Sequence, residues 1–216
     1  LLKKAAIIHD GIKMLIIDFI DRNKSVTIME LRKTIQTVIQ LELTKQNTIK
    51  NKGLAFPIGI SGDSIVAHYT PTKMSQNQKE GLTYNLNPDS LISDFQIIKI
   101  DYGIHLEGNI IDKAFSVNVH DEELQNVLIE SSECAVNNIL KSIGVDSRLN
   151  ELAKEAIEIV ESFEYKDTPI KIIENVYSHN ILPWKIHGNK FIKPDFSNFD
   201  EDLKVEENEQ YAIEIY

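Results

Sequence analysis

The sequence predicts a mixed α/β fold of the α+β kind, in which antiparallel strands are covered by helices. Three observations predict it. The pattern Thr27-Ile-Met-Glu30 is a capping box that opens a helix. Two runs rich in β-branched and aromatic residues, 97–100 and 110–119, have the tight-turn residues Glu107-Gly108-Asn109 between them and indicate a β-hairpin. Apolar residues then recur at helical spacing from residue 121 to residue 163.

The leading segment predicts two helices before the first strand. Residues 1–22 are apolar, but charged residues interrupt them, which indicates an amphipathic helix rather than a secretory signal. The second helix runs from the capping residue Thr27 to about Leu43.

Short apolar runs predict a first hairpin. Residues 54–60 and 65–69 are apolar and are joined by Ser61-Gly62-Asp63, and Pro71 ends the second run. Residues 72–94 are polar and predict a surface loop.

The second half predicts two more helices and a last strand. One helix starts at Asp121 and ends at Gly144, and the next is expected to be capped by Ser147. Their apolar stripes indicate core packing. The alternation in residues 211–216 predicts a final strand.

Asp101 and Asp112 are the most informative residues, because both carboxylates lie in apolar, strand-like runs. With a two-residue turn at Glu107-Gly108, Asp101 lies opposite Ala114, and Asp112 is a diagonal neighbour on the same face, with Cα atoms about 7–8 Å apart. Such acids can reach toward two ions about 3.5–4 Å apart. A turn one residue longer would put them on opposite faces, and solvated acids on an edge hairpin are the other interpretation.

The charge balance disfavours two classes of partner. The 216 residues hold 33 acidic and 23 basic side chains, for a net charge of −10. This disfavours direct binding of nucleic acid or of an anionic membrane. Cys134 is the only cysteine. A disulfide within the chain and a thiolate zinc cage are therefore excluded, and a reducing, cytoplasmic location is expected.

Four further residues are candidates for chemistry: His68, His179, His187 and Glu214. Each histidine alone is more often structural than a ligand. Glu214 lies between Ile213 and Ile215, where a carboxylate either points outward or meets a cation. With the two aspartates, these oxygen and nitrogen donors suit Mn, Fe, Co or Zn. A two-metal centre would generate hydroxide at neutral pH and polarise a carbonyl, which predicts amide or ester hydrolysis.

Six motifs occur in an order that resembles a known family. The chain is similar to the type 2 methionine aminopeptidases, which are pita-bread metallopeptidases. The motifs are Leu54-Ala-Phe-Pro-Ile-Gly59, Ala67-His-Tyr-Thr-Pro71, Lys99-Ile-Asp-Tyr-Gly103, Ile110-Ile-Asp-Lys-Ala-Phe115, Ile186-His187 and Tyr211-Ala-Ile-Glu214. The resemblance implies a pita-bread fold, a mostly antiparallel curved sheet covered by helices.

The resemblance implies a metal role for four residues and a cofactor of two divalent ions (Co, Mn, Fe or Zn). Asp101 and Asp112 match the bridging or chelating aspartates, and His179 matches the histidine ligand of one ion. Glu214 matches a metal ligand that is also the general base for the attacking water.

The resemblance also implies how substrate is held. His68 matches the histidine that meets the substrate and the developing oxyanion, and His187 matches a second histidine at the scissile peptide. Phe56 and Ile186 fall where the family lines its methionine pocket. The implied reaction removes the initiator methionine from nascent chains. Nascent polypeptides are therefore the expected partners, at the ribosome or elsewhere. The protein is expected to be a monomer.

Two other functions remain open. One is a catalytically inactive pita-bread protein that binds ribosomes or other partners. The other is an X-Pro peptidase of the prolidase kind, which shares the ligand set. Persistence of all four alignable ligands favours an enzyme, and the motif Ala67-His-Tyr-Thr-Pro71 favours the methionine enzyme.

The resemblance also sets an expectation about extent. Residues 1–216 are expected to form one peptidase domain that lacks the C-terminal strands and the helical insertion of type 2. The family's fifth ligand, a glutamate on a later strand, would follow residue 216.

Overall fold

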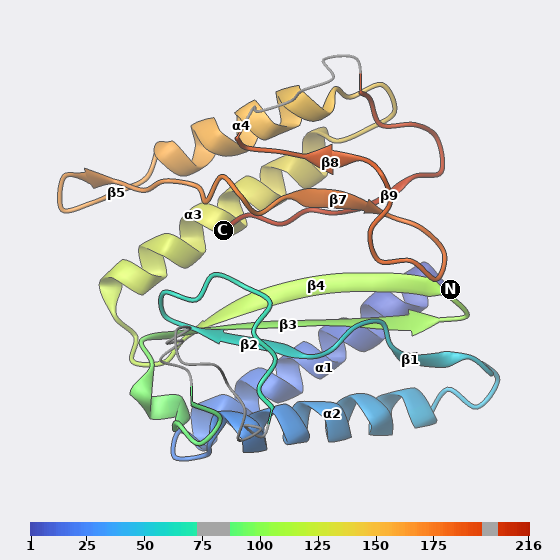
Figure 1. Ribbon diagram of the computed structural model, residues 1–216, viewed down its shortest axis with the longest axis vertical. Coiled ribbons are helices and arrows are strands. Elements are labelled where there is room, and N and C mark those ends of the chain that lie inside the picture. Colours follow the sequence, from blue (N-terminus) through green and yellow to red (C-terminus); the bar gives the residue numbers. More distant parts are fainter. Residues whose placement is uncertain (73–86, 196–202) are drawn as a thin grey trace, which may run out of the picture. The chain divides into compact units, whose positions relative to one another are not determined.

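The computed structural model describes residues 1–72, 87–195 and 203–216 (Figure 1). The chain divides into two compact units, residues 1–122 and residues 123–216. This division does not decide whether residues 1–216 form one domain, which stays a prediction. In the described residues, no helix combines the length and the apolar character needed to cross a membrane.

The first unit begins with the two expected helices, α1 (Leu2–Arg22) and α2 (Ile28–Thr44). The buried residues of α1 recur every three or four positions, so that one stripe of the helix enters the core; they are Ala5, His9, Ile12, Ile16 and Ile20. Both helices lie along one face of a sheet (Figure 1).

That sheet is built around its longest hairpin, β3 (Ile97–Leu106) and β4 (Asn109–Asn118). The other edge of β3 pairs with β2 (Gly59–Gly62) and, farther along, with β1 (Lys52–Leu54), and all of these pairs are antiparallel. A 3-10 turn, η1 (Ile92–Asp94), leads into β3.

Alternation in β3 decides which side chains enter the core. Five residues of β3 are fully buried and pack in the cluster that includes α1 and α2: Ile98, Ile100, Tyr102, Ile104 and Leu106. Residues in between, including Asp101, face the other side of the sheet because successive side chains alternate. A run that is apolar on one face therefore presents polar chemistry on the other.

The predicted first hairpin is wrong. Residues 55–58 separate β1 from β2, and residues 65–69 form no strand. Ile65 N instead donates to Gly62 O in a turn, and the chain returns so that Ile60 N donates to Tyr69 O at 2.8 Å. Left-handed conformations at Asp63 (φ 45°) and His68 (φ 64°) bend this segment out of the extended geometry that a strand needs.

The predicted loop at residues 72–94 is only partly described, because residues 73–86 lie outside the described residues. In the part that is described, Leu91 forms a bridge with Thr27, and Ile92 is fully buried. The end of this segment is therefore anchored to the start of α2.

The capping box that opens α2 is confirmed. Thr27 Oγ1 accepts from Glu30 N at 3.2 Å, and Glu30 Oε2 accepts from Thr27 N at 2.9 Å. Replacing Thr27 with alanine is expected to lower the free energy of unfolding by about 1 kcal/mol, because Glu30 N loses its acceptor and the Glu30 carboxylate loses the bond from the Thr27 hydroxyl.

Urea unfolding measures this loss, and Thr37→Ala is the matched control. Thr37 is exposed within the same helix and donates to Lys33 O, so its removal is expected to change stability by less than about 0.5 kcal/mol. Equal losses in both variants would contradict a specific contribution from the cap.

The second unit packs two helices against short strands. Helix α3 (Glu123–Ser142) is followed by α4 (Leu149–Glu161). The predicted core packing is confirmed for α4, whose apolar stripe shares a core with Ala135 and Ile139 of α3, but Leu124 and Leu128 of α3 are exposed. The start and the cap differ from the prediction. Helix α3 begins two residues after Asp121, which has φ 59°, and the N-cap of α4 is Arg148. The hydroxyl of Ser147 instead accepts from Gly144 N at 3.0 Å.

The strands of this unit are short. A two-stranded sheet joins β5 (Glu164–Tyr165) to β6 (Thr168–Pro169). The other sheet has the order β8 (Phe191–Ile192), β7 (Ser178–Ile181), β9 (Gln210–Ala212), all antiparallel. The last strand is shorter than predicted, and Glu214 lies two residues beyond it. The mixed, antiparallel fold class is confirmed.

Candidate functional site

The β3–β4 hairpin places Asp101 and Asp112 on one face of the first unit's sheet. Asp101 pairs with Ala114 and Gly103 pairs with Asp112, so the two acids are diagonal neighbours on adjacent strands. The predicted register is therefore confirmed. Both acids are half-buried, and α1 covers the opposite face of the sheet. The geometry lets both carboxylates act on one group.

Phe56 lies over the same face as these acids. A Cβ on Gly103 would come within 2.4 Å of Phe56 Cε1, so the ring occupies the space that a side chain would need. Because residues two apart in a strand share a face, Gly103 and Asp101 point to the same side. Gly103 was missed by the sequence analysis. A glycine inside an apolar strand is the signal, since it marks the close approach of another group.

His68 is exposed and has a left-handed backbone, with φ 64°. Its neighbour Tyr69 is tied to β2 by the bond from Ile60 N, and Gly59 of β2 pairs with Asp101. A non-glycine residue in this conformation costs on the order of 1 kcal/mol, which the surrounding contacts must offset.

Lys99 contributes charge to the face that carries Asp101. It lies two residues before this acid in β3, and its Nζ donates to Asp63 O at 2.6 Å. Burial lowers the pKa of Lys99 to about 8, against a smaller opposing effect of Asp63. The sequence analysis did not single out this lysine, because its burial depends on the packing around β2.

In the second unit, His179 and Glu214 meet although 35 residues separate them in the sequence. His179 Nε2 lies 3.0 Å from Glu214 Oε1, and only 3% of His179 is exposed. His179 Nδ1 lies 3.3 Å from Asn180 O. The carbonyl and the carboxylate both only accept, so a neutral imidazole can donate to one of them and turns its lone pair toward the other.

A neutral imidazole therefore leaves one of these two acceptors facing a lone pair. A second proton on the imidazole satisfies both contacts, as in an ordinary ion pair. A divalent cation held by Nε2 and Oε1 would satisfy them as well, because imidazole nitrogen and carboxylate oxygen are ligands that such ions take. A backbone carbonyl on Nδ1 is the usual support for a histidine ligand.

Ser178 holds the backbone of Glu214. Its hydroxyl accepts from Glu214 N at 2.8 Å and donates to Glu214 O at 3.1 Å, and Ser178 is 2% exposed. This contact positions Glu214 just beyond β9, where the strand pairing has ended. The sequence analysis missed Ser178; the only signal was a hydroxyl directly before the candidate ligand His179.

His187 packs edge-to-face against His179, with ring centroids 4.2 Å apart and an interplanar angle of 88°. His187 itself is exposed, and Ile186 beside it is half-buried. The structure thus brings His179, His187 and Glu214 together within the second unit, and Asp101, Asp112 and Phe56 together within the first.

The sequence of this chain matches a known protein family. The family model for metallopeptidase family M24 matches residues 1–216. Methionine aminopeptidase 2 of Botryotinia fuckeliana is 34% identical over 168 residues, which cover 76% of this chain and 34% of that protein. Methionine aminopeptidase 2 of Clavispora lusitaniae is 33% identical over 194 residues, which cover 88% of this chain and 40% of that protein. The chain therefore spans about a third to two fifths of the length of these curated relatives.

A solved structure shows the fold. The crystal structure of methionine aminopeptidase from Rickettsia prowazekii superposes with a TM-score of 0.73 at 17% identity, over 97% of this chain and 75% of that chain. This likeness confirms the expected pita-bread fold. At this level of identity it carries no information about substrate.

Proposed function

Because this chain belongs to metallopeptidase family M24, we propose that it carries the metal ligands and the substrate-binding residues of a type 2 methionine aminopeptidase. The observation that carries the proposal is the contact of buried His179 with half-buried Glu214, whose ligand atoms face each other at 3.0 Å. This pair supplies a donor set for a divalent cation within an M24 sequence.

The proposed cofactor is a pair of divalent ions, of Co, Mn, Fe or Zn. Asp101, Asp112, His179 and Glu214 are the proposed ligands, since three carboxylates and one imidazole are hard or borderline donors that suit these ions. When bound, the ions supply an activated water and polarise the carbonyl to be cleaved. The diagonal placement of Asp101 and Asp112 on one face supports a shared role for the two acids.

In this proposal, side chains of the protein accept a proton from the attacking water and donate hydrogen bonds to the substrate. Glu214 accepts the proton of the attacking water at its carboxylate, and the Ser178 clamp on its backbone holds that carboxylate in place. His187 donates to the scissile peptide and His68 to the oxygen that gains charge. Donors fixed before the reaction stabilise that charge without reorganising.

Methionine recognition is assigned to an apolar pocket that includes Phe56 and Ile186. The Phe56 ring is held in the space over Gly103, on the face that carries the two acids. A pocket of this kind discriminates modestly, since one methylene is worth only about 1–3 kcal/mol. The free amine of the substrate must therefore be recognised by charge.

Nascent polypeptides with an N-terminal methionine are the proposed substrates, at the ribosome or after release, and the proposed location is the cytoplasm. We propose a monomer. The net charge of −10 supports an enzyme that does not bind nucleic acid or an anionic membrane surface directly.

Peptide hydrolysis with added metal tests this function against its alternatives. With Co²⁺ or Mn²⁺, we expect the protein to cleave Met-Gly-Met and to leave an X-Pro dipeptide intact. His179→Ala is expected to lower kcat/KM by at least about 100-fold, because a ligand is lost. His120→Ala is the control, since His120 is an exposed histidine of the first unit.

Each other outcome rejects the proposal in a different way. Cleavage of the X-Pro dipeptide alone would assign the protein to the prolidase kind. Failure to bind either metal in calorimetry would assign it to the inactive binding proteins.

A further inference from the structure

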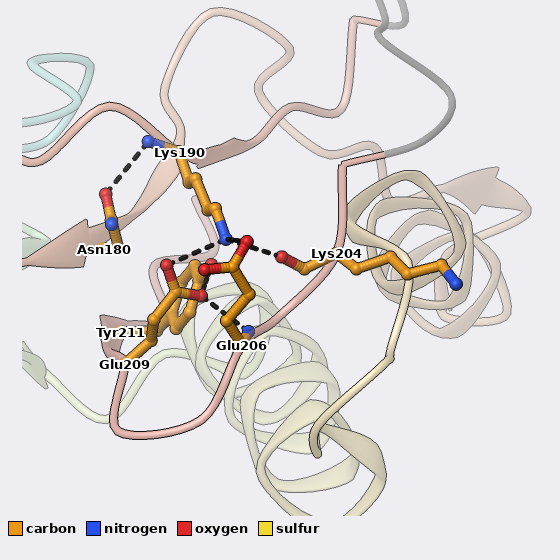
Figure 2. A network of polar contacts seen from close by, with 6 residues as sticks. All are labelled: Asn180, Lys190, Lys204, Glu206, Glu209 and Tyr211. Atoms are coloured by element: carbon orange, nitrogen blue, oxygen red, sulfur yellow. Dashed lines mark hydrogen bonds and ion pairs between the residues drawn. The ribbon is translucent and has the colours of Figure 1, made fainter.

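A buried lysine ties together the segments that surround the His179, His187 and Glu214 cluster. Lys190 is 8% exposed. Its Nζ donates to Lys204 O at 2.8 Å, to Glu206 Oε1 at 3.1 Å and to Glu209 Oε1 at 2.8 Å (Figure 2). An ammonium has three N–H donors, so these contacts use all of them.

The charges of this network compensate the cost of burial. Burial alone would lower the pKa of Lys190, but the contacts with Glu209 and Glu206 outweigh it and raise the pKa. Glu209 Oε2 also accepts from Glu206 N at 2.8 Å and from the Tyr211 hydroxyl at 3.0 Å. The turn before β9 is thereby closed around the lysine.

Asn180 connects this network to the segment that carries His187. Asn180 N donates to Lys190 O at 3.0 Å. Lys190 N donates to Asn180 Oδ1 at 2.9 Å (Figure 2). Gly188 N donates to Asn180 O at 2.7 Å. The backbone and the side chain of one buried asparagine therefore hold both residues 188 and 190.

Gly188 is the point of closest approach. A Cβ on this residue would lie 2.2 Å from Asn180 Oδ1 and 2.6 Å from its Cγ. The asparagine amide cannot yield freely, since the bond from Lys190 N holds its oxygen. Only glycine fits between this amide and the end of the segment.

The two histidines are the direct sequence neighbours of these anchors. His179 precedes Asn180, and His187 precedes Gly188. Their edge-to-face contact at 4.2 Å lies next to the Asn180 to Gly188 bond. A displacement of Asn180 therefore moves the backbone next to His179, and a displacement of Gly188 moves the backbone next to His187.

We infer that Asn180 and Lys190 are positioning residues, which hold His187 edge-on against His179 through Gly188. The inference rests on the proposed function for its consequence, since His187 is the residue assigned to the scissile peptide. Within the same segment, Leu182 and Lys185 pair as an isolated bridge, and Trp184 turns the chain with φ 63°.

Gly188→Ala tests the inference without removing any charged group. The added methyl group must displace the Asn180 amide and break its bond to Lys190 N. The readout is the Hε1–Cε1 resonances of the histidines in the metal-free, isotope-labelled protein at one pH, assigned with His187→Gln. We expect the His187 and His179 signals to lose the mutual ring-current shift that edge-to-face packing produces and to move toward that of exposed His120.

Gly144→Ala is the matched control. Gly144 belongs to the same unit, and a Cβ there would have no heavy atom within 4 Å. We expect it to leave every histidine signal in place. Asn180→Ala, which removes the same contact without a clash, is expected to move the signals as Gly188→Ala does. Lys190→Gln is expected to move them less, because the backbone bonds of residue 190 remain.

Two results would overturn the inference. One is that Gly188→Ala and Asn180→Ala lower the melting temperature but leave the His179 and His187 signals unchanged, which would make the network purely structural. The other is that all histidine signals move together, including that of His120, which would indicate general unfolding. A protein that shows the expected shifts but binds no metal would contradict the proposed function alone.

Discussion

Replacing Asp112 with asparagine is expected to abolish metal-dependent peptide hydrolysis while leaving the protein folded. The amide keeps the size and shape of the carboxylate but removes its charge, and a neutral oxygen binds a divalent cation far more weakly. We expect metal affinity to fall by on the order of 100-fold or more, and turnover to be lost with it. Calorimetry measures the affinity, and the Met-Gly-Met assay measures the turnover.

The stability of this variant separates a metal role from a structural one. Asp112 and Asp101 are like charges on neighbouring strands, so the metal-free variant is expected to unfold at the same temperature as the parent or slightly above it. Asp121→Asn is the control for charge, since Asp121 is an exposed acid of the same unit, in a left-handed conformation that asparagine adopts well. Undiminished turnover in Asp112→Asn would refute the metal role.

Acid is expected to destabilise the first unit through His9. This histidine of α1 is fully buried and stacks on Tyr102 of β3, with ring centroids 4.1 Å apart and an interplanar angle of 6°. His9 Nε2 lies 2.9 Å from Tyr102 O and donates to it, since a carbonyl only accepts. His9 Nδ1 is buried, with no hydrogen-bond partner in the described part of the chain. Protonation would therefore add an N–H without an acceptor.

The direction of the effect follows from the pKa of His9. Burial lowers it from 6.5 to about 4, with a further lowering by Lys113 and opposing effects of the bond to Tyr102 and of Asp10 and Asp112. The unfolded chain binds this proton more readily than the folded protein does. The contribution of neutral His9 to the free energy of unfolding is therefore fully present above pH 6.5. As the pH falls to about 4, the free energy of unfolding decreases by up to about 3 kcal/mol.

Urea unfolding of the metal-free protein at pH 7 and at pH 4.5 measures this loss. His9→Gln keeps an amide donor for Tyr102 O but cannot titrate, so it is expected to lose about 2 to 3 kcal/mol less than the parent between these two values. His120→Gln, at an exposed histidine, is expected to behave as the parent does. An equal loss in His9→Gln and the parent would show that His9 is not the acid-sensitive group.

The strongest local patterns predicted the first unit well. The capping box at Thr27 formed as expected, since both of its bonds lie within four residues. The Asp101 and Asp112 register was predictable because the two-residue turn at Glu107-Gly108 leaves only one pairing that buries the apolar side of β3. The strand predicted at the apolar run of residues 65–69 is wrong. The conformation of this run depends on the return of the chain to β2, which no local pattern encodes.

The candidate site was predictable only in its residue types. Family motifs identified His179, His187 and Glu214 as candidates. They did not predict that the Ser178 hydroxyl accepts a hydrogen bond from Glu214 N. They also did not predict that the Phe56 ring lies in the space left by the missing side chain of Gly103. These contacts join residues far apart in the sequence, so a single sequence gives no signal for them beyond an unexplained glycine or hydroxyl.

The sequence by itself determined the helices, the long hairpin and the face that carries its two acids, because each depends on the alternation or spacing of neighbouring residues. Only the tertiary structure decided that His179 faces Glu214 across 35 residues and that the Lys190 ammonium is buried among two carboxylates and a carbonyl. The reason is physical: a buried charge is tolerated only where the folded chain supplies its partners, and those partners come from distant segments.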